Sequence, residues 1–121
     1  MRIPALLGSV ARSRQWSVRL ARSHGACDTT VQVVELLTSE VVTNAVKYGR
    51  VTGTIELHLD RDADVLRVSV GDDNPTPPRV LAHSGVRAGG QGMRLVAQLA
   101  EAWGWCPARG GKSVWFTVPL V

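Results

Sequence analysis

The chain has 121 residues, a length that suits one domain rather than two. Hydrophobic residues make up 45% and charged residues 20%, so the composition is that of a folded globular protein and excludes a largely disordered chain. The formal net charge is +4, and the charge is uneven, because the N-terminal part carries several arginines before the first acidic residue, Asp28.

Several classes of protein are disfavoured by simple patterns. Cys27 and Cys106 stand far apart and outside any CxxC pattern, which argues against a disulfide scaffold and a cysteine-based metal site. No run approaches the ~18 apolar residues of a membrane span, and the short apolar start is interrupted by Pro4, unlike an export signal. We therefore expect a cytoplasmic protein that does not enter a membrane.

The N-terminal arginines admit two interpretations. They form a solvated helix face, or they form a surface for nucleic acid, an acidic protein or an anionic membrane. Trp16 is the one aromatic residue among them, and the chain contains no zinc-finger or RNA-binding pattern, so we expect no direct nucleic-acid binding. The residues concerned are Arg2, Arg12, Arg14, Arg19 and Arg22.

Two helices are predicted in the first half of the chain. Residues 1–9 form a leading strand or an unstructured arm, and the main domain covers residues 10–121. The first helix runs from Val10 to Ser23, and the second from Thr29 to Tyr48. Apolar residues recur every three or four positions along the second helix and form one stripe: Val31, Val34, Leu37, Val41, Ala45 and Tyr48.

The second half of the chain favours strands. "TIELHLD" and "VLRVSVGD" alternate apolar and polar residues, as in an antiparallel hairpin with one buried face. A long loop rich in proline and glycine follows, then a short helix from about Gly92 with an apolar side, and two strands, "AWGWCP" and "SVWFTVPLV". The apolar side of the short helix consists of Met93, Val96, Leu99 and Ala100. We expect an α+β two-layer sandwich, in which helices cover one face of a mainly antiparallel sheet. Trp103, Trp105 and Trp115 are expected to help close its core.

Glu40 and Asn44 are the first candidates for a functional site. They are four residues apart, so they share one face of the second helix, and Lys47 lies one turn further on. A carboxamide oxygen is a suitable ligand for Mg²⁺, and a nearby carboxylate can accept a proton from a hydroxyl group. Exposed polar residues on a helix surface would produce the same pattern, so this pattern alone leaves both interpretations open.

Two further segments carry weaker signals. In "VSVGDDNPTPP", Asp72 ends a core strand and could accept a hydrogen bond from a ligand amine, although Asp-Asn-Pro is also a good turn sequence. "GGQGM" opens a helix, where free backbone N–H groups can meet an anion, but it could equally be a flexible loop. The chain has neither a P-loop nor a GxGxxG pattern after a strand.

The order of these segments resembles the boxes of the GHKL ATPases, which include gyrase, Hsp90, histidine kinases and MutL. "SEVVTNAVKYG" is similar to the N box, "VSVGDDNPTPP" to the G1 box, and "GGQGM" to the G2 box. "GGKSVWFTVPL" resembles the last box and closing strand in the form found in bacterial anti-sigma-factor serine/threonine kinases. The resemblance extends from about Val10 to Leu120 and implies the Bergerat, or histidine-kinase-like ATPase, fold.

The resemblance implies ATP and Mg²⁺ as cofactors and assigns roles to individual residues. Glu40 matches the proposed catalytic base, Asn44 the Mg²⁺ ligand and Asp72 the residue that binds the adenine amino group. An ATP lid is expected from about Arg79 to Gly92. The remaining expected cofactor-binding residues belong to the helix end, the G1 loop, the G2 box and the last box: Lys47, Asn74, Pro75, Gly90, Gly92, Met93 and Ser113. The sequence departs from the family at Tyr48, where a histidine is frequent, and at Gln91 and Met93, which replace an arginine and a leucine.

The resemblance implies that the protein phosphorylates a serine or threonine of a STAS-domain antagonist, with a sigma factor as a second partner. The alternative is a non-catalytic ATP-binding module that sequesters a regulatory partner. A histidine-kinase catalytic domain would share the fold, but no helix with a phosphoacceptor histidine precedes the domain in this sequence. A homodimer is compatible with these interpretations, and the sequence does not select an oligomeric state.

Overall fold

The computed structural model describes residues 1–49, 53–78 and 92–121. These parts of the chain form three helices and five strands. In chain order the elements are β1 (Arg2–Pro4), α1 (Gly8–Ser23), α2 (Asp28–Tyr48), β2 (Thr54–Asp62), β3 (Val65–Asp72), α3 (Gly92–Leu99), β4 (Ala102–Ala108) and β5 (Gly111–Pro119).

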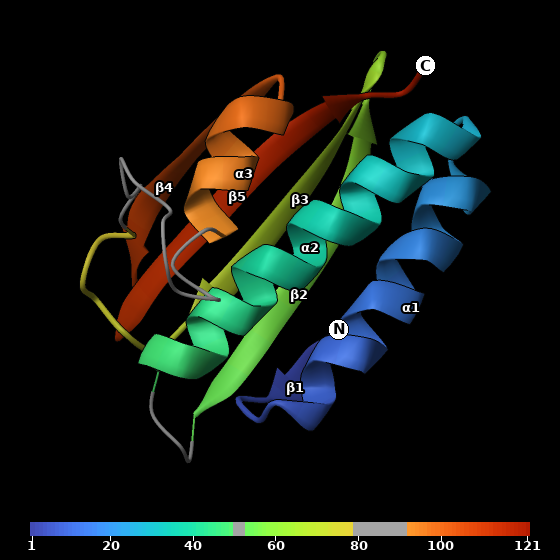
Figure 1. The fold of residues 1–121 in the computed structure, drawn as a ribbon. Coiled ribbons are helices and arrows are strands. Elements are labelled where there is room, and N and C mark those ends of the chain that lie inside the picture. Colours follow the sequence, from blue (N-terminus) through green and yellow to red (C-terminus); the bar gives the residue numbers. More distant parts are fainter. Residues whose placement is uncertain (50–52, 79–91) are drawn as a thin grey trace.

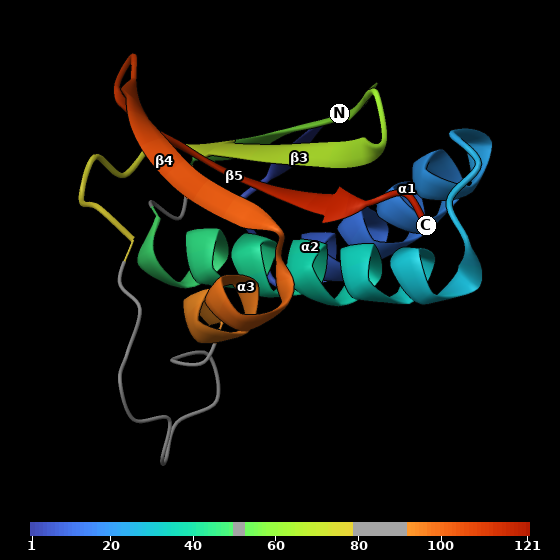
Figure 2. The ribbon, with the colours of Figure 1, turned by 90° about the horizontal axis from the view of Figure 1, so that it is seen from above.

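The strands form one sheet in the order β1-β2-β3-β5-β4, and every neighbouring pair is antiparallel. Figure 2 shows the sheet as one layer and the helices as a second layer that covers one of its faces. In Figure 1, α2 crosses the middle of the sheet, with α1 on one side of it and α3 on the other. The predicted two-layer α+β sandwich is therefore confirmed.

The N-terminal residues contribute to this sheet. β1 pairs with the edge of β2, and Ile3 is buried in the hydrophobic core. The N-terminal amino group donates a hydrogen bond of 2.7 Å to the carbonyl oxygen of Leu57. Residues 1–9 thus contain a leading strand, and Gly8 and Ser9 already belong to α1, two residues before the predicted start of that helix.

The apolar stripe of α2 packs on the inner face of the sheet. Its members are almost fully buried except Tyr48, whose side chain lies at the end of the helix and is exposed. The inner face of the sheet supplies alternating residues from its three central strands, because successive side chains of a strand point to opposite faces. These buried strand residues are Ile55, Leu57, Leu59, Leu66, Val68, Val70, Val114, Phe116 and Val118.

Of the three tryptophans that were predicted to help close the core, only Trp103 packs against it. Phe116 fills the inner face of β5, while alternation along the strand places Trp115 on the outer face. The guanidinium group of Arg67 lies 4.4 Å from the ring centroid of Trp115, a cation–π contact on that outer face. Trp103 is half-buried against the core, and Trp105, on the edge strand β4, is 37% exposed.

The short helix α3 is less buried than its sequence suggests. Met93 and Val96 lie in the core, but Leu99 is 44% exposed, and Leu36 of α2 is 39% exposed.

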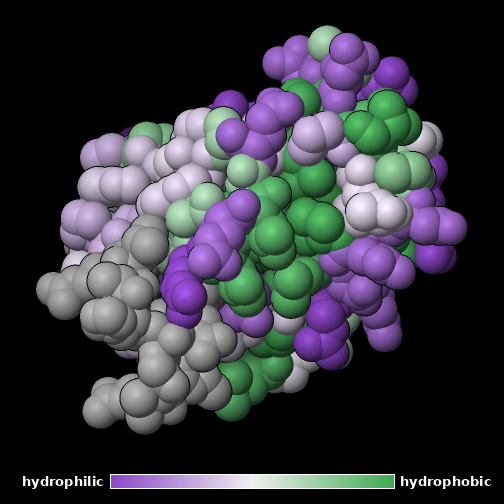
Figure 3. All heavy atoms as spheres, turned by 45° about the horizontal axis from the view of Figure 1, so that its top comes forward, coloured by the Kyte–Doolittle hydropathy of each residue, from purple (hydrophilic) through white to green (hydrophobic). Residues whose placement is uncertain are grey.

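Figure 3 shows apolar residues gathered in the middle of one face of the molecule, with hydrophilic residues around them. Among the described residues, no helix has the length and apolar character needed to cross a bilayer.

Candidate functional site

Asp72 is the last residue of β3, and it points to the inner face of the sheet, as Leu66, Val68 and Val70 do before it. Its paired residue on the neighbouring strand β5 is Lys112, so the Lys112 side chain points to the same face of the sheet. The two side chains are almost completely buried, with 4% of Asp72 and 8% of Lys112 exposed. The Lys112 Nζ atom lies 3.2 Å from Oδ1 and 3.1 Å from Oδ2 of Asp72, so the two residues form a buried ion pair.

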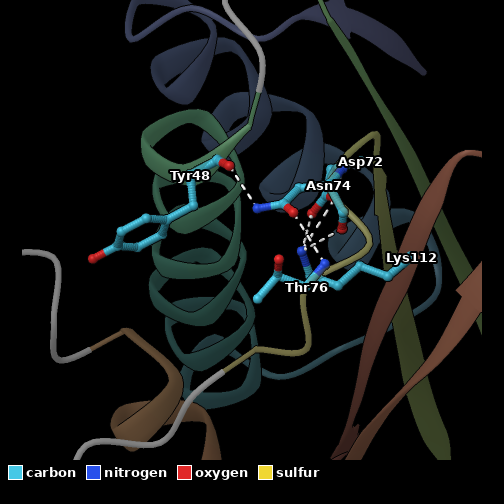
Figure 4. A network of polar contacts seen from close by, with 5 residues as sticks. All are labelled: Tyr48, Asp72, Asn74, Thr76 and Lys112. Carbon is cyan, nitrogen blue, oxygen red and sulfur yellow. Dashed lines mark hydrogen bonds and ion pairs between the residues drawn. The ribbon is translucent and has the colours of Figure 1, made fainter.

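The turn after β3 folds around this ion pair (Figure 4). The backbone N–H of Asn74 donates a hydrogen bond of 2.8 Å to Oδ1 of Asp72, and the Asn74 carbonyl oxygen accepts one of 3.0 Å from Lys112. The backbone N–H of Thr76 donates to Oδ1 of Asn74 at 3.0 Å. These local bonds are the usual turn chemistry of Asp and Asn, and they fix the start of the G1 loop.

The same turn is tied to α2. The Asn74 side-chain amide donates a hydrogen bond of 2.6 Å to the carbonyl oxygen of Tyr48, the last residue of the helix. The carbonyl groups of the last helical turn lack partners within the helix, so Asn74 satisfies one of them. Figure 4 shows the Tyr48 ring directed away from this network. The bond therefore holds the end of β3 next to the end of α2.

Glu40 and Asn44 lie on α2, about two turns and one turn before this junction, and both are half-buried. Ser39 accepts a hydrogen bond of 3.5 Å from Arg14 and so marks the side of α2 that faces α1. Successive residues of a helix are about 100° apart, which directs Glu40 and Asn44 away from α1 and toward the side where α3 packs. Asn44 stands one turn before Tyr48, at the same end of the molecule as Asp72.

Two glycines allow the backbone to pack tightly around the turn. A Cβ atom at Gly111 would collide with the carbonyl oxygen of Asp72 and would lie 2.7 Å from the Cα atom of Asp73. A Cβ atom at Gly53 would collide with the carboxylate of Asp73. A larger residue at Gly111 would therefore displace the backbone of the turn, whereas at Gly53 the Asp73 side chain can move aside, so Gly111 is the position that needs glycine for steric reasons.

The other predicted site residues have different surroundings. Lys47 and Pro75 are exposed, Gly92 begins α3, and Met93 is buried in the core. Ser113 pairs with Gly71 on the outer face of the sheet, opposite to the face that carries Asp72. Gly90 and most of the predicted lid lie outside the described residues.

Lys112 is the site residue that the sequence analysis did not identify. Counting along the alternating strand "KSVWF" from the buried Phe116 would have placed Lys112 and Val114 on the inner face and Ser113 on the outer face. The partner of Lys112 depends on strand register, because Asp72 and Lys112 are 40 residues apart in the chain.

The arrangement offers one feature that suits a nucleobase. Oδ1 of Asp72 accepts two hydrogen bonds, from the Asn74 N–H and from Lys112, whereas among the described residues Oδ2 has one polar contact, the Lys112 Nζ atom at 3.1 Å. Oδ2 therefore retains an acceptor position for a ligand N–H group. A buried carboxylate with an open acceptor position fits the amino group of adenine.

The side chains on α2 are chemically suited to a magnesium–phosphate group. Mg²⁺ is usually held by one or two protein oxygens together with phosphates and water, and Asn44 and Glu40 both offer oxygens. Among residues 1–49, 53–78 and 92–121, no group of three or more His, Cys, Asp or Glu side chains could hold a metal ion. The two oxygens of Asn44 and Glu40 fit an ion whose other ligands are nucleotide phosphates and water.

Comparison with known proteins agrees with these features. The family described as the histidine kinase-like ATPase domain matches residues 3–118. The chain belongs to this family. Domains of this family bind ATP, so the coarse function is that of an ATP-binding domain. A comparison with curated proteins gives no match.

Solved histidine kinases share the fold. The blue-light activated histidine kinase of Erythrobacter litoralis EL346 is 28% identical, with a TM-score of 0.58, over 78% of this chain and 32% of that one. The histidine kinase domain of the same protein is 24% identical, with a TM-score of 0.60, over 98% of this chain and 62% of that one.

The mycobacterial sensor histidine kinase MprB is 15% identical, with a TM-score of 0.56, and the match covers 98% of this chain and 97% of that one. The chain spans less than two thirds of the length of the two Erythrobacter structures.

Proposed function

We propose that the protein is a regulatory Mg-ATP-dependent kinase that phosphorylates a serine or threonine of a STAS-domain antagonist of an anti-sigma factor. The observation that supports it most strongly is the buried carboxylate of Asp72, which keeps Oδ2 open and is anchored through Asn74 to the helix that carries Asn44 and Glu40. The order of the sequence boxes supports the anti-sigma branch.

In this proposal each residue has a distinct task. Asp72 accepts a hydrogen bond from the adenine amino group and orients the base. Asn44 contributes an oxygen ligand to magnesium, which neutralises phosphate charge when it is bound. Glu40, one turn earlier on α2, orients or deprotonates the acceptor hydroxyl. Catalysis then rests mainly on positioning and on charge neutralisation.

The proposed partners follow from the same branch of the family. The substrate is a STAS-domain antagonist, and a sigma factor competes with it for the kinase, so phosphorylation controls how much sigma factor is free. We propose that the protein acts in the cytoplasm, as a monomer or a homodimer, and without direct contact with nucleic acid.

ATP binding can be tested by calorimetry with and without Mg²⁺. We expect the wild-type protein to bind ATP, Asp72→Asn to lose binding to the base, and Asn44→Ala, which removes the ligand oxygen, to lose the enhancement by Mg²⁺. Circular dichroism of each variant separates lost binding from lost folding. Undiminished ATP binding by folded Asp72→Asn would remove the adenine assignment.

Phosphoryl transfer requires a separate test with labelled ATP and purified STAS-domain proteins as acceptors. Glu40→Gln should bind ATP and lose transfer. Glu35→Gln is a matched control, because Glu35 lies on the same helix but lines the groove between α1 and α2 with Val18 and Arg22. If Glu40→Gln transfers phosphate as fast as this control, Glu40 is not the base.

The alternative is a non-catalytic ATP-binding module that sequesters its partner. It is favoured by Gln91 and Met93, which replace the arginine and leucine that the family usually has in the G2 box. ATP binding by the wild-type protein without any label on the antagonist would support this alternative over the kinase.

A further inference from the structure

The burial of Lys112 is unusual for its residue type. β5 otherwise presents Val114, Phe116 and Val118 to the inner face, and Lys112 continues this row with a charged side chain that is 8% exposed. Removing a charge from water is costly, and a buried ion pair commonly contributes less to stability than an apolar pair of similar volume. Stability alone is therefore a weak explanation for a lysine at this position.

The hydrogen-bonding capacity of Lys112 is fully used. An ammonium group has three N–H donors, and Nζ lies within 3.2 Å of Oδ1 and Oδ2 of Asp72 and of the carbonyl oxygen of Asn74. Lys112 thus has no donor left for a ligand in this arrangement. Asp72, in contrast, keeps an acceptor position on Oδ2. The pair as a whole offers a ligand an acceptor and no donor.

We propose that Lys112 is a specificity-determining positioning residue, which holds Asp72 as an acceptor-only carboxylate and so selects 6-aminopurine over 6-oxopurine nucleotides. This inference rests on the proposed nucleotide site. A 6-amino group donates an N–H to Oδ2. A 6-oxo group in the same place would bring its acceptor oxygen against Oδ2, which is also an acceptor, so no hydrogen bond could form. A site built for one hydrogen-bonding pattern rejects a ligand with the opposite pattern.

The role of the ammonium group becomes visible when it is removed. Without Lys112 the carboxyl group of Asp72 would be buried without a counter-charge, and buried groups in that position become neutral. A protonated carboxyl group is also a donor, and it can form a hydrogen bond with a 6-oxo group. Loss of Lys112 should therefore change which base is preferred, in addition to weakening binding.

The experiment measures dissociation constants for ATP and inosine triphosphate, which differ at the purine 6-position, with purine riboside triphosphate as a reference that lacks a 6-substituent. We expect the wild-type protein to bind ATP about tenfold or more tightly than inosine triphosphate, because one charge-assisted hydrogen bond contributes an affinity difference of about this size. In Lys112→Met the ratio should fall to about one or below. Lys112→Arg should keep the wild-type preference.

Arg67→Met is the matched control. It also removes one positive charge from the inner strands of the sheet, but Arg67 lies on the outer face against Trp115. It should therefore change the affinity for all three triphosphates equally and leave their ratio unchanged. Circular dichroism establishes that each variant is folded, and Lys112→Gln, which keeps donors without the charge, replaces Lys112→Met if the latter does not fold.

The outcomes separate this inference from the proposed function. If the wild-type protein binds none of the triphosphates, the nucleotide site is wrong and the role of Lys112 falls with it. If the wild-type protein prefers ATP and folded Lys112→Met or Lys112→Gln keeps the same preference, the site stands and Lys112 is only structural. A collapsed preference in these variants, with an unchanged preference in Arg67→Met, supports the inference.

Discussion

Asp72→Asn should destabilise the fold far more than its small change in shape suggests. Only 8% of the Lys112 side chain is exposed, so the substitution leaves its ammonium group buried without a counter-ion. Removing one partner of a buried pair costs about 3–5 kcal/mol, whereas an exposed pair contributes about 0.2–1 kcal/mol. For a domain of this size, a loss of 3 kcal/mol lowers the melting temperature by about 12 °C.

A double-mutant cycle measures this coupling directly. Asp72→Asn, Lys112→Met and the double variant are unfolded in urea and followed by tryptophan fluorescence. Because the double variant contains no unpaired charge, it should be more stable than the sum of the single effects implies, with a coupling energy of about 2–3 kcal/mol.

The exposed pair of Arg2 and Glu56 provides an internal control. Their charged atoms are 3.6 Å apart, but 71% and 50% of the two side chains are exposed. The same cycle at this pair should give a coupling energy below about 1 kcal/mol. If the Asp72–Lys112 coupling is as small as the control, burial does not strengthen this ion pair and the reasoning fails.

Three further outcomes are expected. Gly111→Ala should lower the free energy of unfolding by about 3 kcal/mol and weaken nucleotide binding, because its Cβ atom would collide with the Asp72 backbone. Gly110→Ala, which has open space but a positive φ, should lower it by about 1 kcal/mol. Equal losses for the two variants in urea unfolding would contradict the steric argument. Thr38→Val should stabilise the protein by about 1 kcal/mol, because the Thr38 hydroxyl is buried without a hydrogen-bond partner among the described residues; a loss of stability would show that the hydroxyl has a partner. The hydrogen bond from His58, together with the charge of Arg2, lowers the pKa of Glu56, so its stabilising effect is present at neutral pH and is lost as the pH falls through the lowered pKa. His58→Ala should raise that pKa in an NMR titration of the carboxyl carbon, and an unchanged value would exclude this cause.

Local periodicity was sufficient to predict most of the elements. The stripe on α2 and the alternation in β2, β3 and β5 each depend on neighbours in the sequence, and the structure confirms them. The predictions failed where an apolar residue stands at the end or edge of an element. Tyr48, Leu99 and Trp105 match the apolar pattern, but too little of the sheet or of another helix lies over them to bury them.

The candidate site shows the same division. Sequence patterns alone marked Asp72 as the end of a core strand and placed Glu40 and Asn44 on one face of a helix, because these properties follow from the repeat of a single element. The contacts of Asp72 and Asn74 with distant residues depend instead on how separate elements pack. Lys112 faces Asp72 only because β3 and β5 pair in one register, and Asn74 bonds to Tyr48 only because α2 ends beside β3. No local repeat encodes either distance, so only the tertiary structure could show that Asp72 is held by a buried lysine.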